Sequence, residues 1–167
     1  MVIDLNDLVR DFAIAAERAR IDGWSRQLRD GLQLEYLQAP HYLPWLRAGF
    51  GAVYAFALSS SAGESAPCRA GCVLKVGRVG ASNKRRFRYS HYRPDGPRST
   101  LARSLVSYPF MWPWLGIDHL DNTNVKQWML SSLDRLHIFV PDGHPSILAA
   151  LEVYTRARMG SVFEGAA

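Results

Sequence analysis

The stretch from residue 71 to residue 93 constrains the fold of this chain more than any other part. It opens with an apolar run at residues 72–74, whose branched and aliphatic side chains favour a β-strand. Gly77 and Gly80 interrupt that pattern, and a basic, aromatic-rich segment follows. A strand, a glycine turn and a cationic helix together present backbone and guanidinium donors to a phosphate. The alternative is a solvated basic helix that follows an ordinary strand.

Apolar periodicity predicts the remaining elements of the main domain. Strands are expected at residues 51–58, 70–76 and 136–140, and the Ser- and Gly-rich residues 59–67 predict a hairpin loop between the first two. Apolar residues at helical spacing predict helices, which cover residues 83–92, 101–107, 124–134 and 146–158. Residues 108–116, with two prolines and four aromatic side chains, predict an irregular packed loop.

The N-terminal part of the chain predicts helices. Residues 4–19 carry one apolar stripe at helical spacing, and a second short helix is expected at residues 25–36. We therefore expect a helical extension over residues 1–48 and a main domain over residues 49–167. The predicted fold class is α/β of the α+β type, with a small three-stranded, mostly antiparallel sheet flanked by helices.

Composition limits the class of partner. A chain of 167 residues with 48% hydrophobic side chains can bury a real core, and its net charge of +5 suits an anionic partner such as nucleic acid. No apolar run reaches the roughly 18 residues that a membrane span needs, and the N-terminus lacks a secretory pattern. Cys68 and Cys72 complete neither a disulfide framework nor a zinc site. A cytoplasmic location is expected, with no membrane association.

Two short motifs of one nuclease family have counterparts here. Residues 52–54 read Ala-Val-Tyr where the family has Gly-Ile/Val-Tyr, and Gly51 lies one place earlier. Residues 75–77 read Lys-Val-Gly where the family has Tyr-Ile/Val-Gly, so lysine replaces the second tyrosine, as it does in some members. With the strands and helices expected between them, these motifs resemble the GIY-YIG nuclease domain over residues 51–165.

Further family positions follow in the same order. The family arginine falls on Arg85 by its distance from the second motif, or on Arg86, which precedes an apolar residue as the family arginine usually does. The family's acidic residue falls on Glu152. Glu164 stands where many members have an asparagine, which is a departure from the pattern.

The resemblance implies a metal-dependent endonuclease that hydrolyses phosphodiester bonds in DNA. Tyr54 would act as the base or position the attacking water, and Lys75 would favour the ionised phenol. Arg85 or Arg86 would bind the scissile phosphate through its guanidinium fork. Taken alone, Tyr54 is equally an ordinary strand tyrosine.

Two more residues complete the expected site. Glu152 would ligate Mg²⁺ or Mn²⁺, hard cations that accept one carboxylate together with water and phosphate oxygens. His91, close to the basic residues, would relay a proton, or it is a surface histidine. The alternative for Glu152 is a solvated glutamate. We expect Tyr54, Lys75, one of the two arginines and Glu152 to converge on one concave surface.

Basic side chains around this site are expected to contact the DNA backbone; they are Arg78, Lys84, Arg88 and Arg93. A second hypothesis is a GIY-YIG-like module that binds nucleic acid but has lost cleavage, or an interaction subunit of a larger complex. The N-terminal helices are the expected surface for a protein partner or a homodimer.

Overall fold

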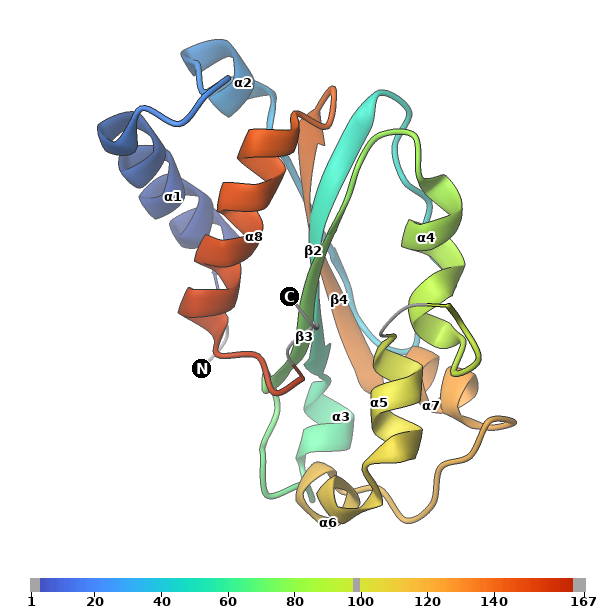
Figure 1. The fold of residues 1–167 in the computed structure, drawn as a ribbon. Helices are drawn as coiled ribbons and strands as arrows, with labels where there is room; N and C mark the ends of the chain where they lie inside the picture. Colours follow the sequence, from blue (N-terminus) through green and yellow to red (C-terminus); the bar gives the residue numbers. More distant parts are fainter. Residues whose placement is uncertain (1–3, 98–99, 164–167) are drawn as a thin grey trace.

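The structure, a computed structural model, describes residues 4–97 and 100–163. Its centre is an antiparallel sheet of four strands in the order β1-β4-β2-β3. The strands are β1 (Gln33–Leu37), β2 (Phe50–Leu58), β3 (Val73–Val79) and β4 (Leu133–Pro141). Helices α1 (Leu5–Ala19), α2 (Arg26–Gly31) and α8 (Pro145–Met159) lie on one side of the sheet, and α4 (Lys84–Tyr89), α5 (Leu101–Ser107) and α7 (Val125–Ser132) lie on the other (Figure 1).

The prediction of three strands is wrong, because β1 adds a fourth. The helix expected over residues 25–36 ends at Gly31, and the chain then pairs with β4, placing Glu35 opposite His137. As a short edge strand with half-buried side chains, β1 lacks the apolar run that marks a central strand. The α+β class and the antiparallel pairing are confirmed.

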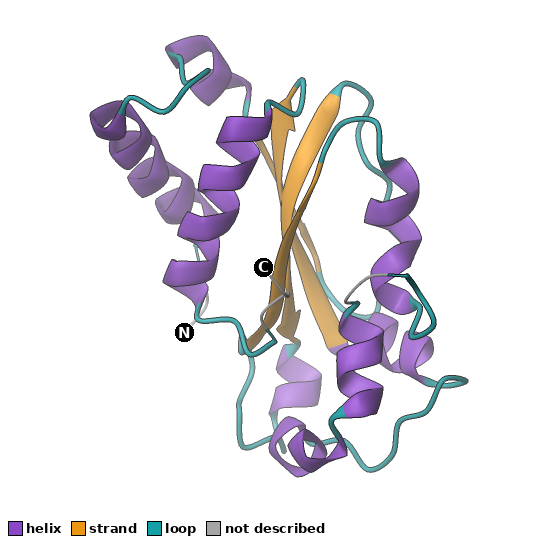
Figure 2. Cartoon of the chain, viewed as in Figure 1, coloured by secondary structure: helices purple, strands orange, loops and turns teal. Residues whose placement is uncertain are grey.

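Most other elements lie close to their predicted positions. Helix α5 has the predicted bounds, whereas β3 begins and ends three residues later than predicted. The loop expected at residues 59–67 contains a short helix, α3 (Ser60–Gly63). The segment 108–116 contains the 3₁₀ turn Pro109–Met111 and the short helix α6 (Trp112–Leu115) (Figure 2).

The central strand β2 is buried on both faces. Side chains alternate along a strand, so Tyr54 and Phe56 pack in the core beneath α4 and α5, while Val53 and Ala55 pack in the core beneath α1 and α8. Two hydrophobic cores therefore flank one sheet, and the side chains of β2 that face α4 are buried.

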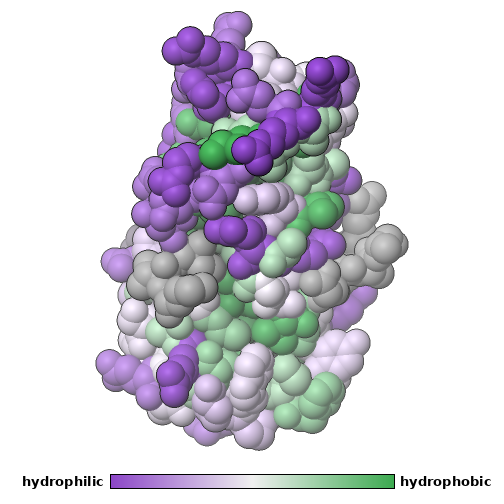
Figure 3. All heavy atoms as spheres, turned by 90° about the vertical axis from the view of Figure 1, so that its left-hand side faces the viewer, coloured by the Kyte–Doolittle hydropathy of each residue, from purple (hydrophilic) through white to green (hydrophobic). Residues whose placement is uncertain are grey.

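The segment before residue 48 is joined to the same sheet and core. Helix α1 packs on α8, and Phe12 makes edge contacts with Trp24 and Tyr154. Much of the outer surface on this side is hydrophilic, with apolar atoms gathered lower down (Figure 3). The large apolar side chains exposed on α1 and α8 are Ile14 and Val153. A partner or homodimer on this side stays a prediction.

Among the described residues, no helix has both the length and the apolar character that crossing a bilayer requires.

We expect the protein to lose stability as the pH falls from about 6.5 toward 4. His137 is fully buried, and burial lowers its pKa to about 4 although the adjacent Glu35 carboxylate acts in the opposite direction. Below about pH 6.5 the unfolded chain binds a proton on this histidine that the folded protein does not bind. The loss reaches about 3 kcal/mol, because each pKa unit corresponds to about 1.4 kcal/mol.

Urea denaturation across this pH interval measures the loss directly. The His137→Gln variant is the control, since it removes the titrating ring and should flatten the pH dependence. His91, whose pKa burial also lowers well below the ordinary value, leaves a residual slope of the same sign. A free energy of unfolding that stays constant from neutral pH to about 4.5 would contradict the prediction.

Candidate functional site

Tyr54 lies on β2, with Gly77 opposite it on β3 and His137 opposite it on β4. Its ring leans over Gly77, where a Cβ atom would lie 2.7 Å from the phenolic oxygen. The hydroxyl is hydrogen-bonded to Nε2 of His91 at 2.5 Å. The Tyr54 hydroxyl therefore has a buried polar partner, and the absence of a side chain at Gly77 leaves room for its ring.

His91 comes from the 3₁₀ turn Ser90–Tyr92 that follows α4. It is 3% exposed, so the surface-histidine alternative is wrong. Burial, followed by the positive charges of Arg135, Lys75 and Arg86, lowers its pKa well below the ordinary value. The ring is thus neutral at physiological pH and can accept a hydrogen bond through Nε2.

The protonation of the phenol agrees with this assignment. Burial raises the pKa of Tyr54, and Arg86 and Arg135 oppose that rise by favouring the phenolate. The Glu152 carboxylate acts with burial to raise the pKa. Because the phenol keeps its proton, Tyr54 donates the hydrogen bond and Nε2 of His91 accepts it.

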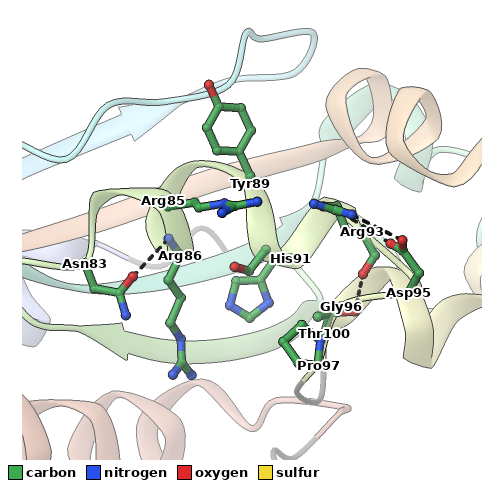
Figure 4. Close-up of a pocket in the computed structure, with 11 residues that line it drawn as sticks. Asn83, Arg85, Arg86, Tyr89, His91, Arg93, Asp95, Gly96, Pro97 and Thr100 are labelled. Carbon is green, nitrogen blue, oxygen red and sulfur yellow. Dashed lines mark hydrogen bonds and ion pairs between the residues drawn. The ribbon is translucent and has the colours of Figure 1, made fainter.

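The structure separates the two candidate arginines. Asn83 caps α4 by accepting a hydrogen bond from the Arg86 backbone N–H at 3.2 Å. From this helix Arg86 extends across β3 toward α8, whereas Arg85 extends in a different direction, near Tyr89 (Figure 4). Arg86 is near enough to Tyr54 to favour its ionisation. It is therefore Arg86, and not Arg85, that lies with the Tyr54–His91 pair.

Arg86 also lines two hollows. The first is a pocket of about 370 Å³ along α4 and the loop after it, with Tyr89, His91 and Arg93 among its lining residues (Figure 4). The second is a groove of about 550 Å³ between β3 and the first half of α8, and Arg78 is among its lining residues. An anion in either hollow would meet the Arg86 guanidinium.

Glu152 is on α8, which covers the opposite face of the sheet from α4 (Figure 1). Its Oε2 contacts Nε of Arg78 on β3 at 3.2 Å, and its Oε1 accepts from Nη2 of Arg156 at 3.2 Å. The expected convergence on one concave surface is wrong for Glu152: Tyr54 packs on the α4 side of the sheet, whereas Glu152 lies on the α8 side (Figure 1). The side chain is 17% exposed, so Glu152 is not a solvated glutamate.

We call the set Tyr54, Arg78, Arg86, His91 and Glu152 the edge site. Lys75 lies beside it on β3, opposite Phe56, and is 4% exposed. Its positive charge is among the causes that keep His91 neutral. The expected role of Lys75 beside the Tyr54 phenol stays a prediction.

A divalent cation would have one acidic ligand here. Within the described residues, no group of three or more His, Cys, Asp or Glu side chains is placed to hold a metal ion. Glu152 offers the hard oxygen donor that Mg²⁺ and Mn²⁺ prefer, and such a cation accepts the rest of its ligands from water and phosphate. Both Glu152 oxygens face arginines, so a cation would have to displace at least one of those contacts.

The side chains expected to contact DNA differ in their surroundings. Lys84 is exposed on α4, and Arg93 pairs with Asp95 at 3.2 Å. The guanidinium of Arg88 lies over the Trp45 ring, 3.3 Å from its centroid. Arg78 is the partner of Glu152. Lys84 is thus openly presented to a phosphate, whereas Arg88 is engaged with an aromatic ring. Glu164, at the family's asparagine position, lies outside the described residues.

Sequence reasoning missed Arg135, which lies fully buried under the edge site. The predicted third strand began at residue 136, whereas β4 begins at Leu133 and carries Arg135 in its interior. A charged residue directly before an apolar run was the available signal. That signal identifies a buried cation only when the strand is known to include the charged residue.

Replacing Gly77 with alanine is expected to destabilise the protein by about 1–3 kcal/mol, because the new methyl group would overlap the Tyr54 phenol. Gly80→Ala is the matched control, since a Cβ there meets nothing within 4 Å. Chemical denaturation of both variants compares the two free energies of unfolding. Equal stability of the two variants would show that the ring moves aside without cost.

Comparison of the chain with protein-family models, with curated proteins and with solved structures finds no match. Membership of the GIY-YIG family therefore stays a proposal, and it rests on the geometry of the edge site.

Proposed function

We propose that this protein is a GIY-YIG-type, metal-dependent endonuclease that hydrolyses phosphodiester bonds in DNA. The observation that carries the proposal is the buried hydrogen bond from Tyr54 to a neutral His91, with Arg86 beside it at two hollows. A core tyrosine needs no histidine held neutral and no arginine at its hydroxyl. A site that moves a proton next to a phosphate needs both.

Substrate binding is assigned to α4. Arg86 would take the scissile phosphate in its guanidinium fork, and the exposed Lys84 and Arg85 on the same helix would meet neighbouring phosphates. The net charge of +5 attracts a polyanion to this surface.

Proton transfer is assigned to Tyr54 and His91. The phenol passes its proton to Nε2 of His91 as it takes one from the attacking water. The water oxygen then bonds to phosphorus while the bond to the leaving oxygen breaks, and the leaving oxygen takes a proton from solvent. Arg86 stabilises both the phenolate and the charge that develops on the phosphoryl oxygens. Tyr54 is 1% exposed, so substrate binding must draw Arg86 toward the phosphate and open a path to the hydroxyl.

Glu152 is the residue that would hold Mg²⁺ or Mn²⁺. When bound, the cation would neutralise negative charge on the phosphoryl group. Without the cation, the Glu152 carboxylate pairs with Arg78 at the groove. When Glu152 binds the cation instead, Arg78 becomes free to contact the DNA backbone.

A second candidate function is binding of nucleic acid without cleavage. It is favoured by the two ion pairs that occupy Glu152 and by the burial of Tyr54. In that case the protein acts as an interaction subunit, with a partner or a second copy on the α1 side. A cytoplasmic location, where Cys68 and Cys72 stay reduced, suits both candidates.

Incubation with supercoiled plasmid in Mg²⁺ or Mn²⁺ distinguishes the two candidates. The wild type should nick the plasmid, chelation of the cation should stop it, and Tyr54→Phe should retain DNA binding without nicking. DNA binding with no nicking in either cation would reject the endonuclease and leave the binding module. Nicking by Tyr54→Phe at the wild-type rate would reject the site.

A further inference from the structure

Arg135 on β4 is a fully buried arginine beneath the edge site. Its Nη2 donates to the Phe87 carbonyl at 2.7 Å, and its Nη1 donates to the Tyr92 hydroxyl at 3.2 Å. Within residues 4–97 and 100–163, no carboxylate forms an ion pair with it. A buried cation of this kind needs an explanation, because an unpaired charge in a core is costly.

Aromatic rings surround the guanidinium in place of a carboxylate. Its carbon lies 4.5 Å from the centroid of Phe87, 4.9 Å from that of Phe56 and 5.2 Å from that of Tyr54. Such contacts offset part of the cost of burial. An apolar side chain would fill the same space without that cost, so the charge is expected to act on a group that faces it.

The groups that can respond to this charge are Tyr54 and His91. The charged and titratable side chains that face the pair come from four elements; they are Arg86 on α4, Lys75 on β3, Glu152 on α8, and Arg135 and His137 on β4. Among them Arg135 is fully buried and held by two hydrogen bonds.

We propose that Arg135 is a positioning residue for the cleavage proposed above: it holds the α4 backbone through the Phe87 carbonyl and places a positive charge beside the Tyr54 ring, where that charge favours the ionised phenol. This role rests on the proposed function. It explains why one guanidinium contacts both the Phe87 carbonyl and the Tyr54 ring.

The electrostatics agree with the geometry. After burial, Arg135 is the largest cause of the lowered pKa of His91. At Tyr54, burial raises the pKa, and Arg86 and Arg135 are the main groups that oppose it.

The test compares Arg135→Gln, which keeps hydrogen-bonding groups but removes the charge, with Arg135→Lys, which keeps the charge. NMR titration of ring-labelled histidines, with the His91 signal assigned from its absence in His91→Asn, reads the charge of His91 without any DNA. We expect the midpoint for His91 to rise by about one pH unit or more in Arg135→Gln and to stay near the wild-type value in Arg135→Lys. Plasmid nicking should fall at least about tenfold in Arg135→Gln, with its rise toward alkaline pH displaced upward.

Three outcomes would overturn the inference. The first is a titration midpoint of His91 that stays unchanged in folded Arg135→Gln. The second is a loss of nicking in that variant while the His91 titration and the pH profile keep their wild-type form, because such a loss would show a purely structural role. If Arg135→Gln does not fold, a His91 midpoint raised by about a unit in Arg135→Lys rejects the charge effect. Absence of nicking by the wild type rejects the proposed function instead, and the titration still shows whether Arg135 controls His91.

Discussion

Replacing Arg86 with alanine is expected to lower the rate of plasmid nicking by about 100- to 1,000-fold. Arg86 lies beside the Tyr54 phenol and lines both hollows at the edge site. Its loss removes the phosphate fork and also a cation that favours the ionised phenol, so two contributions to the transition state disappear together. The fold should persist, because the side chain is only partly buried and alanine is a strong helix former.

Arg85→Ala is the matched control for Arg86→Ala. The two arginines are neighbours on α4 and carry the same charge, but Arg85 is exposed and leaves the helix in a different direction from Arg86 (Figure 4). Its removal should weaken DNA binding modestly and lower the salt slope by about 0.9, as expected for one phosphate contact. Nicking at saturating DNA should stay within about tenfold of the wild-type rate. Equal losses in both variants would contradict the assignment of Arg86.

Glu152→Ala is expected to reduce nicking by about 100- to 1,000-fold as well, without weakening DNA binding. The carboxylate is the acidic group that would hold the cation, so its contribution to the transition state would be lost. Binding to DNA should stay equal or become tighter, because a negative charge is removed and Arg78 and Arg156 lose their acidic partner. Helix α8 remains anchored by Leu148 and Leu151.

Fluorescence anisotropy in chelator measures DNA binding separately from cleavage. Glu152→Gln, which keeps the size of the side chain and an acceptor for the arginines, separates the loss of the charge from the loss of the two contacts. Thermal melting of both variants should show a change of no more than about 1 kcal/mol, as is usual for partly exposed ion pairs. Nicking by Glu152→Ala at the wild-type rate would show that Glu152 serves only to hold Arg78 and Arg156.

The fold followed from local patterns except where a strand depended on its partner. Helix α5 and the central strand β2 were predicted almost to their ends, because capping residues and apolar runs mark them. Strand β1 was taken for a helix, since its half-buried residues carry no continuous apolar run. Its identity depends on β4, about 100 residues later, which supplies the hydrogen bonds that a lone edge segment lacks.

The candidate site was likewise predicted in part from the sequence, while the rest depends on how the elements pack. The family resemblance pointed to Tyr54 and Glu152, and the position of His91 in the basic segment pointed to that residue, but Arg85 and Arg86 stayed equivalent. The direction in which each arginine leaves α4 separates them, and that direction depends on how the helix packs on the sheet through Phe87. Glu152 was expected on the Tyr54 side of the sheet, whereas α8 covers the other face and brings it to β3 from behind.

The residue types along the chain were sufficient for the α+β class, the basic character of α4 and the identity of the chemically capable side chains, because these depend on composition and short-range periodicity. The protonation states of Tyr54 and His91 could not be predicted from the sequence. Tyr54 keeps its proton because burial raises its pKa against the opposing charges of Arg86 and Arg135. His91 stays neutral because burial and the charges of Arg135, Lys75 and Arg86, which come from three different elements, lower its pKa. Burial and the sum of distant charges arise only when those elements pack together, and they determine whether an ordinary tyrosine and histidine can exchange a proton.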